Sequence, residues 1–214
     1  MRFASLKLAS AMSLIGFVLF AVFVKKDDVS GFDDPIIKVV QGWESPGLTR
    51  FMRTISTLGS TLDVVVIAIL IVVAFALFLR HRKELVLFAV ALGGTALING
   101  LLKDVFERDR PLLHRLAEEE GFSFPSGHSM ASFTLAVITV YLLWKHVSSR
   151  LLRAVLILLA VTWFVVMGIS RIYLGVHYPS DVVAGYLLSG FWVSLTIMAY
   201  RKWTAGSGSS SYSY

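Results

Sequence analysis

Three short segments of this chain carry residues suited to the chemistry of a phosphoryl group. They supply cations, imidazoles, hydroxyls and a carboxylate, in the order Lys103 and Arg110, then Pro125-Ser126-Gly127-His128, then Ser170-Arg171, His177 and Asp181. Phosphoryl transfer is catalysed mainly by positioning and by electrostatic stabilisation of spread negative charge. The three segments therefore predict a site that cleaves a phosphate ester.

The cations and the glycine-containing segment predict how the phosphoryl group is held. The planar fork of an arginine can bind two phosphate oxygens at once. If a helix begins near Ser126, its free N–H groups and its dipole favour an anion there, and Gly127 lets the backbone come close. We predict as phosphate-binding residues Lys103, Arg110, Ser126, Gly127 and Arg171.

The two histidines have different expected tasks. Pro179 disfavours a helical conformation at Tyr178, so His177 is expected on the turn just before the last helix. From there Asp181 could hold one ring nitrogen and leave the other free to attack phosphorus. His128 has no carboxylate at matching spacing and lies at the expected helix start, which suits a general acid. We predict that these two histidines and Asp181 are catalytic.

The composition indicates the surroundings of this chemistry. Of the 214 residues 56% are hydrophobic and only 16% are charged, which is too apolar for a water-soluble domain. The chain has no cysteine, so disulfides and thiolate metal sites are excluded. The net charge of +6 arises from cations at the ends of apolar stretches, which indicates membrane orientation. We expect a bilayer as the partner and no nucleic acid; nothing in the sequence indicates the oligomeric state.

The apolar stretches predict the fold. Six of them approach the roughly 20 residues that cross a bilayer, and they cover residues 8–24, 62–79, 85–102, 130–144, 151–169 and 182–200. We predict an all-α, polytopic membrane bundle of six transmembrane helices, formed by a single domain of residues 1–204. Residues 205–214 are rich in glycine and serine and are expected to be a flexible tail, of the kind that cloning leaves. The first stretch is interpreted as an uncleaved anchor.

The long segment between the first two stretches is expected to contain short helices. Asp34-Pro35 and Ser45-Pro46 each resemble an N-cap followed by proline at the first helical position. Apolar residues at helical spacing follow the second pair, from Leu48 to Leu58. These helices could lie at the membrane interface or pack on the bundle, and the pattern allows both.

The distribution of charge predicts the orientation in the membrane. Ten cations but only Glu84 as an acid lie at the two termini and in the loops near 80–84 and 145–153. The positive-inside rule then places both termini in the cytoplasm and all three motif segments on the extracytoplasmic face. The run Glu118-Glu119-Glu120 is interpreted as a solvated charge run rather than a metal site. His81 and His146 are expected to be solvated, and His114 receives no role.

The three segments together resemble the signature of the type 2 phosphatidic acid phosphatase family of membrane lipid phosphatases. They read K-D-V-F-E-R-D-R-P from residue 103, P-S-G-H from residue 125 and S-R-I-Y-L-G-V-H-Y-P-S-D from residue 170. The chain length and the compact loops are similar to those of the small bacterial phosphatidylglycerophosphatase B enzymes. The resemblance implies a lipid phosphate substrate, a phosphohistidine on His177 oriented by Asp181, proton donation by His128, and no metal or other cofactor.

The resemblance leaves the substrate open. Phosphatidylglycerol phosphate is favoured by the similarity to phosphatidylglycerophosphatase B, and undecaprenyl pyrophosphate is favoured by an outward-facing site; phosphatidic acid is a third possibility. An anion transporter or a lipid-phosphate binding protein would use the same cations, but it would leave the two histidines and Asp181 without a task. The apolar stretches argue against a soluble, vanadate-dependent haloperoxidase, whose anion pocket is similar.

Overall fold

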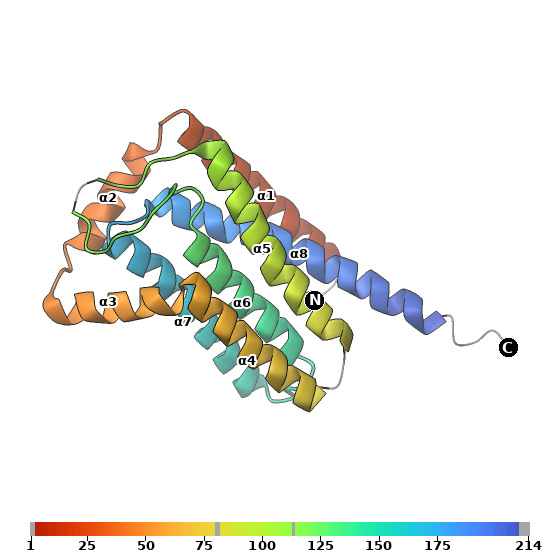
Figure 1. The fold of residues 1–214 in the computed structure, drawn as a ribbon. Coiled ribbons are helices and arrows are strands. Elements are labelled where there is room, and N and C mark those ends of the chain that lie inside the picture. The colour runs from red at the N-terminus through yellow and green to blue at the C-terminus, as the bar shows by residue number, and fades with distance from the viewer. Residues whose placement is uncertain (1–2, 80–81, 113, 210–214) are drawn as a thin grey trace.

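The chain consists of helices and connecting segments in the parts that the computed structural model describes, which are residues 3–79, 82–112 and 114–209 (Figure 1). The helices in chain order are α1 (Phe3–Lys25), α2 (Ser30–Gln41), α3 (Pro46–Leu58), α4 (Thr61–Leu79), α5 (Arg82–Phe106), α6 (Gly127–Leu143), α7 (Arg150–Tyr173) and α8 (Pro179–Ser209). No strand occurs over the described ranges, which confirms the predicted all-α fold. Residues 210–214 of the expected tail and His81 lie outside the described residues, and residues 205–209 belong to α8.

Four helices, α1, α5, α7 and α8, are long and apolar enough to cross a membrane. A fifth candidate is α4 together with α3, which meet at a bend of 60°. Helix α6 is apolar but has 17 residues, about 25 Å of helix against a hydrocarbon core of about 30 Å. The described residues thus hold four or five candidate spans, where we predicted six. Only 11% of the most apolar window of α1 and of α7 is buried, so these surfaces suit a lipid environment.

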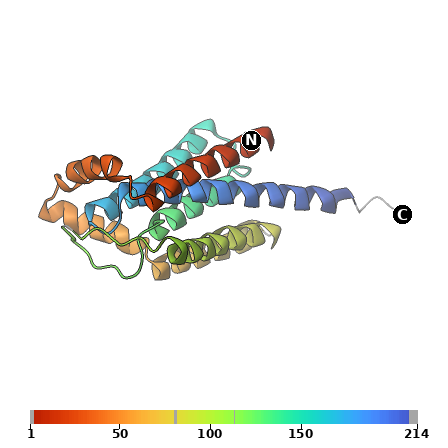
Figure 2. The same cartoon turned by 90° about the horizontal axis from the view of Figure 1, so that it is seen from above.

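Helix α8 runs lengthwise through the bundle, with α1 on one side and α5 on the other (Figure 2). It also packs against α6, and half of its apolar window is buried. Helix α7 packs against α6, and α4 packs against α5 and α6. The helix that begins next to His177 is therefore the one against which α1, α5 and α6 pack.

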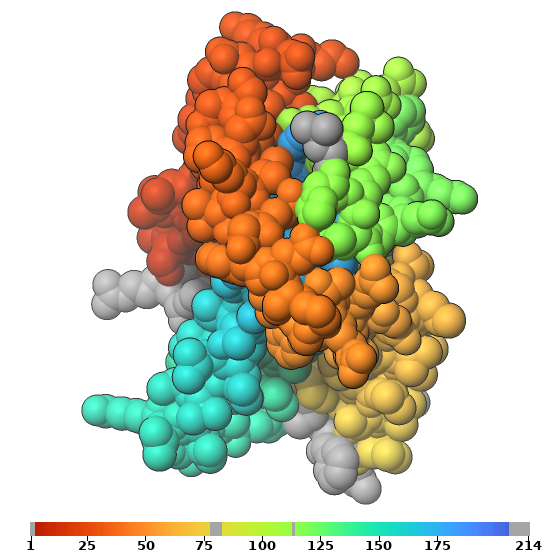
Figure 3. All heavy atoms as spheres, turned by 90° about the vertical axis from the view of Figure 1, so that its left-hand side faces the viewer, coloured from red at the N-terminus to blue at the C-terminus, as the bar shows by residue number. Residues whose placement is uncertain are grey.

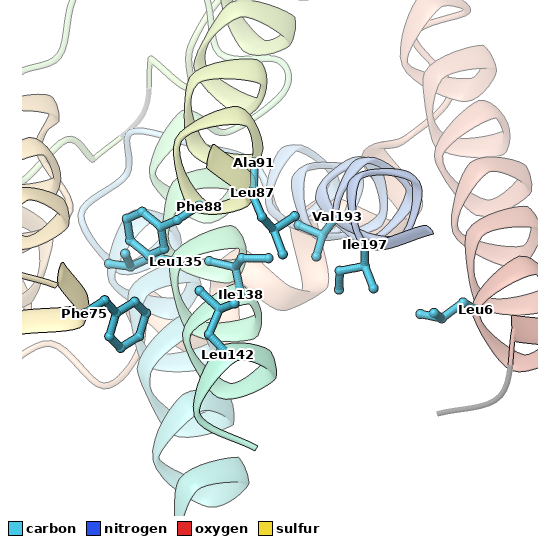
Figure 4. Close-up of a cluster of buried hydrophobic side chains, with 10 residues drawn as sticks. All are labelled: Leu6, Phe75, Leu87, Phe88, Ala91, Leu135, Ile138, Leu142, Val193 and Ile197. Atoms are coloured by element: carbon cyan, nitrogen blue, oxygen red, sulfur yellow. The ribbon is translucent and has the colours of Figure 1, made fainter. Parts of the chain in front are cut away.

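A core cluster joins α1, α4, α5, α6 and α8 in the half of the bundle that holds the C-terminal ends of α6 and α8 (Figure 4). Its buried members are Leu6, Phe75, Leu87, Phe88, Ala91, Leu135, Ile138, Leu142, Val193 and Ile197. The rings of Phe75 and Phe88 meet edge to face with centroids 6.2 Å apart. Because lipid chains are as apolar as these side chains, close packing holds such helices together, and this packing fixes the helices that carry the motifs.

The polar segments gather at one end of the bundle (Figure 1). Helices α2 and α3, the segment 107–126 and the turn between α7 and α8 lie there, whereas the C-terminal end of α8 lies at the other. Figure 3 looks onto the polar end, where α2 and α3 cross the face beside the segment 107–126 and atoms of the α7–α8 turn show between them. The three motif segments thus meet at one end of the bundle, as we predicted.

Helix α3 begins where the sequence predicted. The Oγ of Ser45 accepts a hydrogen bond from the Leu48 N–H at 3.4 Å, and Pro46 is the first helical residue. Met52 is buried, whereas Phe51 is half exposed, and α3 packs against α7. One face of α3 therefore packs on the bundle, and another leaves apolar side chains outside it.

The predicted helix start at Asp34 is wrong. Helix α2 begins at Ser30, and Pro35 lies inside it. The reason is a tertiary contact: Asp33, in the first turn of α2, is buried and accepts hydrogen bonds from the backbone N–H and the hydroxyl of Ser180 on α8, both at 2.7 Å. The Asp34-Pro35 pair in the sequence cannot indicate that Ser180, far along the chain, binds the neighbouring Asp33.

Candidate active site

His177 lies on the turn between α7 and α8, as its position before Pro179 predicted. Its Nδ1 is 3.3 Å from the Oδ2 of Asp181, which lies in the first turn of α8. The same Oδ2 accepts a hydrogen bond from the backbone N–H of Tyr178 at 2.9 Å. Both the imidazole and the carboxylate are almost fully buried. The helix start therefore fixes the orientation of the carboxylate, and the carboxylate fixes the orientation of the ring.

The contacts of His177 determine which ring nitrogen carries the proton. The Nη1 of Arg110 lies 3.1 Å from the His177 Nε2. Because a guanidinium can only donate, Nε2 must accept, and the proton then resides on Nδ1, facing Asp181. Burial lowers the pKa of His177 well below its usual value, and the charges of Arg171 and Arg110 lower it further. The ring is therefore neutral at neutral pH, and the lone pair on Nε2 accepts the hydrogen bond from Arg110.

Arg110 is held in place by backbone carbonyl groups. It donates from Nε to the Gly121 carbonyl at 2.9 Å, from Nη1 to the Val176 carbonyl at 2.9 Å and from Nη2 to the Glu120 carbonyl at 3.0 Å. The residue is 5% exposed. These neutral acceptors orient the guanidinium beside the His177 ring, and the anion nearest to it is the Glu119 carboxylate, 3.4 Å from Nη2.

The second motif forms the predicted N-terminus of α6. Ser126 is the N-cap, and its Oγ accepts from the Ser129 N–H at 3.4 Å. The backbone N–H of Ser126 donates to the carbonyl of Asp181 at 3.1 Å, which ties this motif to the third one. A Cβ on Gly127 would lie only 2.8 Å from the Asn99 Oδ1, so Gly127 allows α5 to approach the start of α6. His128 follows in the first turn of the helix.

Arg171 and Lys103 bring two more cations to the same place. Arg171, at the end of α7, is 1% exposed and donates to the hydroxyl of Ser56 on α3. Its Nε is buried and has no hydrogen-bond partner among the described residues. Lys103, near the end of α5, is half-buried and lies within electrostatic range of Arg110 and Arg171. Ser170, by contrast, is buried and donates to the Met167 carbonyl at 2.6 Å.

The prediction that the acidic run is solvated is wrong for Glu119. Glu118 and Glu120 are exposed, but the Glu119 carboxylate forms ion pairs with Arg171 and, at 3.4 Å, with Arg110. The Nε2 of His128 is 3.9 Å from the same carboxylate. Burial acts to raise the pKa of Glu119, but the charges of Arg171 and His128 outweigh it and hold that pKa below its ordinary value. Glu119 is therefore ionised among the cations of the site.

Arg108 and Asp33 form a second ionic group that the sequence analysis missed. Arg108 donates to the Asp181 Oδ1 at 2.6 Å and to the Asp33 Oδ2 at 3.0 Å. Its guanidinium also stacks on the Tyr178 ring, with 4.0 Å between the guanidinium carbon and the ring centroid. Arg108 stands in the first motif and could have been singled out there. Asp33 carries no local signal, because its partners follow it by more than seventy residues.

The space around the site is open on the polar end. A hollow of about 820 Å³ is lined by Arg53, Arg115 and the acidic run, including Glu119. An apolar cavity of about 640 Å³ between α1, α6, α7 and α8 contains none of the predicted site residues. Of the described groups that surround His177 and Arg171, only Glu119 lines the hollow, so Glu119 connects the site to the polar end of the bundle.

Comparison with known proteins decides the family. The sequence model of the PAP2 superfamily matches residues 84–205, more than half of the chain. The chain belongs to the PAP2 superfamily. The matched part contains all three motifs, from Lys103 to Asp181, and the helices α5 to α8 that carry them.

Curated relatives are similar over more than half of the chain. Phosphatidylglycerophosphatase B of Bacillus subtilis (strain 168) is 34% identical over 174 residues, which cover 80% of this chain and 85% of that protein. The putative undecaprenyl-diphosphatase YbjG of Escherichia coli (strain K12) is 33% identical over 133 residues, 58% of this chain and 61% of the relative.

A solved structure shares the fold. The crystal structure of a transmembrane PAP2-type phosphatidylglycerolphosphate phosphatase from Bacillus subtilis superposes with a TM-score of 0.81 at 28% identity, covering 90% of this chain and 96% of that one. The chain is therefore a membrane lipid phosphatase of this superfamily, close to phosphatidylglycerophosphatase B, and a multi-pass membrane protein. An anion transporter without hydrolytic activity is not supported.

Proposed function

We propose that this phosphatase removes the terminal phosphate of phosphatidylglycerol phosphate and related lipid phosphates through a phosphohistidine on His177. The observation that carries the proposal is the neutral His177 ring, with Nδ1–H facing Asp181 and the lone pair of Nε2 facing Arg110. A buried nitrogen nucleophile beside a guanidinium that can bind phosphate is what an in-line displacement at phosphorus requires.

The reaction then has two steps. The phosphoryl group is bound by the cations and the helix start, that is, by Lys103, Arg110, Ser126, Gly127 and Arg171. In the first step Nε2 of His177 forms a bond to phosphorus, the ester P–O bond breaks, and His128 gives a proton to the leaving oxygen. In the second step His128 takes a proton from water, whose oxygen forms a bond to phosphorus; the bond between phosphorus and Nε2 breaks, which restores the neutral His177 and releases inorganic phosphate. Neither step uses a metal or another cofactor.

The substrate class is a phosphate monoester or pyrophosphate on an apolar anchor. Phosphatidylglycerol phosphate is proposed first because the relative of that activity matches over most of both chains. Undecaprenyl pyrophosphate is the second candidate, since an undecaprenyl-diphosphatase of Sulfolobus acidocaldarius is 25% identical over 85% of each chain.

Phosphate release by the purified protein tests this proposal. Phosphatidylglycerol phosphate, phosphatidic acid and undecaprenyl pyrophosphate are each offered in detergent with a metal chelator. We expect release in the presence of chelator and the highest kcat/KM for phosphatidylglycerol phosphate. A higher kcat/KM for undecaprenyl pyrophosphate would make that lipid the main substrate, and chelator-sensitive turnover would contradict the reaction scheme.

We further propose that residues 1–204 form one domain with six spans, α1 and α4 to α8, and that the polar end faces outward. The cations near 80–84 and 145–153 support cytoplasmic placement of the other end. Helices α2 and α3 then lie at the outer membrane interface, where the exposed side chain of Phe51 on α3 can reach lipid.

The absence of cysteine makes the orientation directly testable. The variants Glu118→Cys and His146→Cys each introduce a single thiol, at opposite ends of the bundle, where both native residues are exposed. A membrane-impermeant maleimide added to intact cells is expected to label only Glu118→Cys. Labelling of only His146→Cys would reverse the proposed orientation.

A further inference from the structure

The Glu119 carboxylate occupies the centre of the cation cluster. One of its oxygens is paired with Arg171 and lies 3.9 Å from the Nε2 of His128, and the other lies 3.4 Å from Arg110. A carboxylate and a phosphoryl group offer an arginine fork the same pair of anionic oxygens. Both arginines and the histidine belong to the groups that we assign to the phosphoryl group and its leaving oxygen.

Burial explains why an anion is needed there. The side chains of Arg171 and Arg110 are 2% and 3% exposed, whereas that of Glu119 is 26% exposed. Two buried guanidinium groups without an opposite charge would be strongly unfavourable. Glu119 enters from the segment 107–126 and supplies that charge when no phosphate is bound.

We propose that Glu119 is an internal competitor of the phosphoryl group, which neutralises the empty site and which the substrate must displace. The inference rests on the proposed function of Arg110 and Arg171 as phosphate ligands. It adds that the Glu119 carboxylate occupies the phosphate site in the free enzyme. Part of the binding free energy of the substrate is then used to displace the Glu119 side chain.

The hollow at the polar end gives the displaced carboxylate a second position. Glu119 lines this hollow together with Arg53 and Arg115. Arg53 donates through Nη2 to the Leu116 carbonyl at 2.7 Å, and Arg115 donates through Nη2 to the Arg110 carbonyl at 3.3 Å. If the Glu119 side chain rotates toward the hollow, its carboxylate leaves the two buried arginines of the site and approaches Arg53 and Arg115, which are more exposed.

Binding of inorganic phosphate measures the competition without turnover. If Glu119 has left the two arginines in only about a tenth of the molecules or fewer, the apparent affinity of the protein for phosphate is reduced about tenfold or more. We expect Glu119→Gln to lower the Kd for inorganic phosphate at least about tenfold in isothermal titration of the detergent-solubilised protein. Glu118→Gln is the matched control, because it removes the same charge from the neighbouring exposed residue, and its Kd should change less than about twofold.

An unchanged or raised Kd in Glu119→Gln would overturn the proposal, since Glu119 would then assist phosphate binding or take no part in it. If this variant does not fold, Glu119→Asp serves instead, because its shorter side chain keeps the charge but reaches the arginines less well. It should also lower the Kd, by a smaller factor. Failure of the proposed function would give a different result from failure of this proposal: inorganic phosphate would still bind in the titration, but the protein would release no phosphate from any of the lipids.

Discussion

His177→Ala is expected to reduce phosphate release from phosphatidylglycerol phosphate by at least about a thousandfold, because no other nucleophile can take its place. The protein should still fold. Asp181 keeps its hydrogen bond from the Tyr178 N–H at 2.9 Å and its ion pair with Arg108 at 2.6 Å. Arg110 keeps its three carbonyl partners. The loss is therefore confined to the reacting nitrogen.

The measurement pairs turnover with trapping of the covalent intermediate. Wild-type protein given a ³²P-labelled lipid phosphate and quenched at alkaline pH should carry label on a histidine, and His177→Ala should carry none. His146→Ala, which alters an exposed histidine at the other end of the bundle, is the control and should match the wild type. Label on His177→Ala, or near-normal turnover by it, would assign the nucleophile to another residue.

His128→Ala is expected to have the second largest effect, and the effect should depend on the leaving group. Loss of a general acid costs roughly 10²–10⁴-fold when the leaving alkoxide needs a proton. An aryl phosphate leaves as a stable phenolate, so its transfer to His177 should be slowed far less. The second step still needs a base to activate water. The variant should therefore accumulate phosphohistidine when it is given an aryl phosphate.

Rapid-quench kinetics with p-nitrophenyl phosphate and with a lipid phosphate separate these outcomes. The expected result is a burst of nitrophenolate followed by slow turnover, with labelled histidine building up. His114→Ala provides the control, because His114 is exposed and lies at the same end of the bundle. An equal loss of rate for both substrates, with no burst, would show that His128 binds the phosphoryl group rather than transferring a proton.

The fold was predictable where a local signal sets the structure. Apolar stretches marked α1 and α4 to α8, and Ser126 marked the start of α6 through its capping hydroxyl. Pro179 correctly placed His177 on a turn, because a proline restricts the residue before it wherever it occurs. At Asp34 the same kind of signal failed, because Asp33 is held by Ser180, whose position only the folded bundle defines.

The sequence predicted that the candidate site residues would gather at one end of the bundle, but it did not predict how they pair. The motif spacing brought His177 and Asp181 together, since His177 lies on the turn just before α8 and Asp181 lies in the first turn of that helix. It could not show which glutamate of the acidic run enters the site, because three consecutive residues of the same type carry no signal that tells them apart. Only the ion pairs of Glu119 with Arg171 and Arg110 distinguish it from its neighbours.

The polar contacts that α2 and α3 make with the motif arginines show which part of the chain the site needs. The superfamily match covers residues 84–205, yet two of the motif arginines find partners outside it: Arg108 pairs with Asp33, and Arg171 donates to Ser56. The recognisable half of the chain is thus chemically incomplete by itself. A chimaera that joins residues 84–205 to another N-terminal half would keep every motif but lose the groups that orient Arg108 and Arg171. The whole bundle, rather than the part that carries the motifs, is therefore the unit that must be transferred to keep the site.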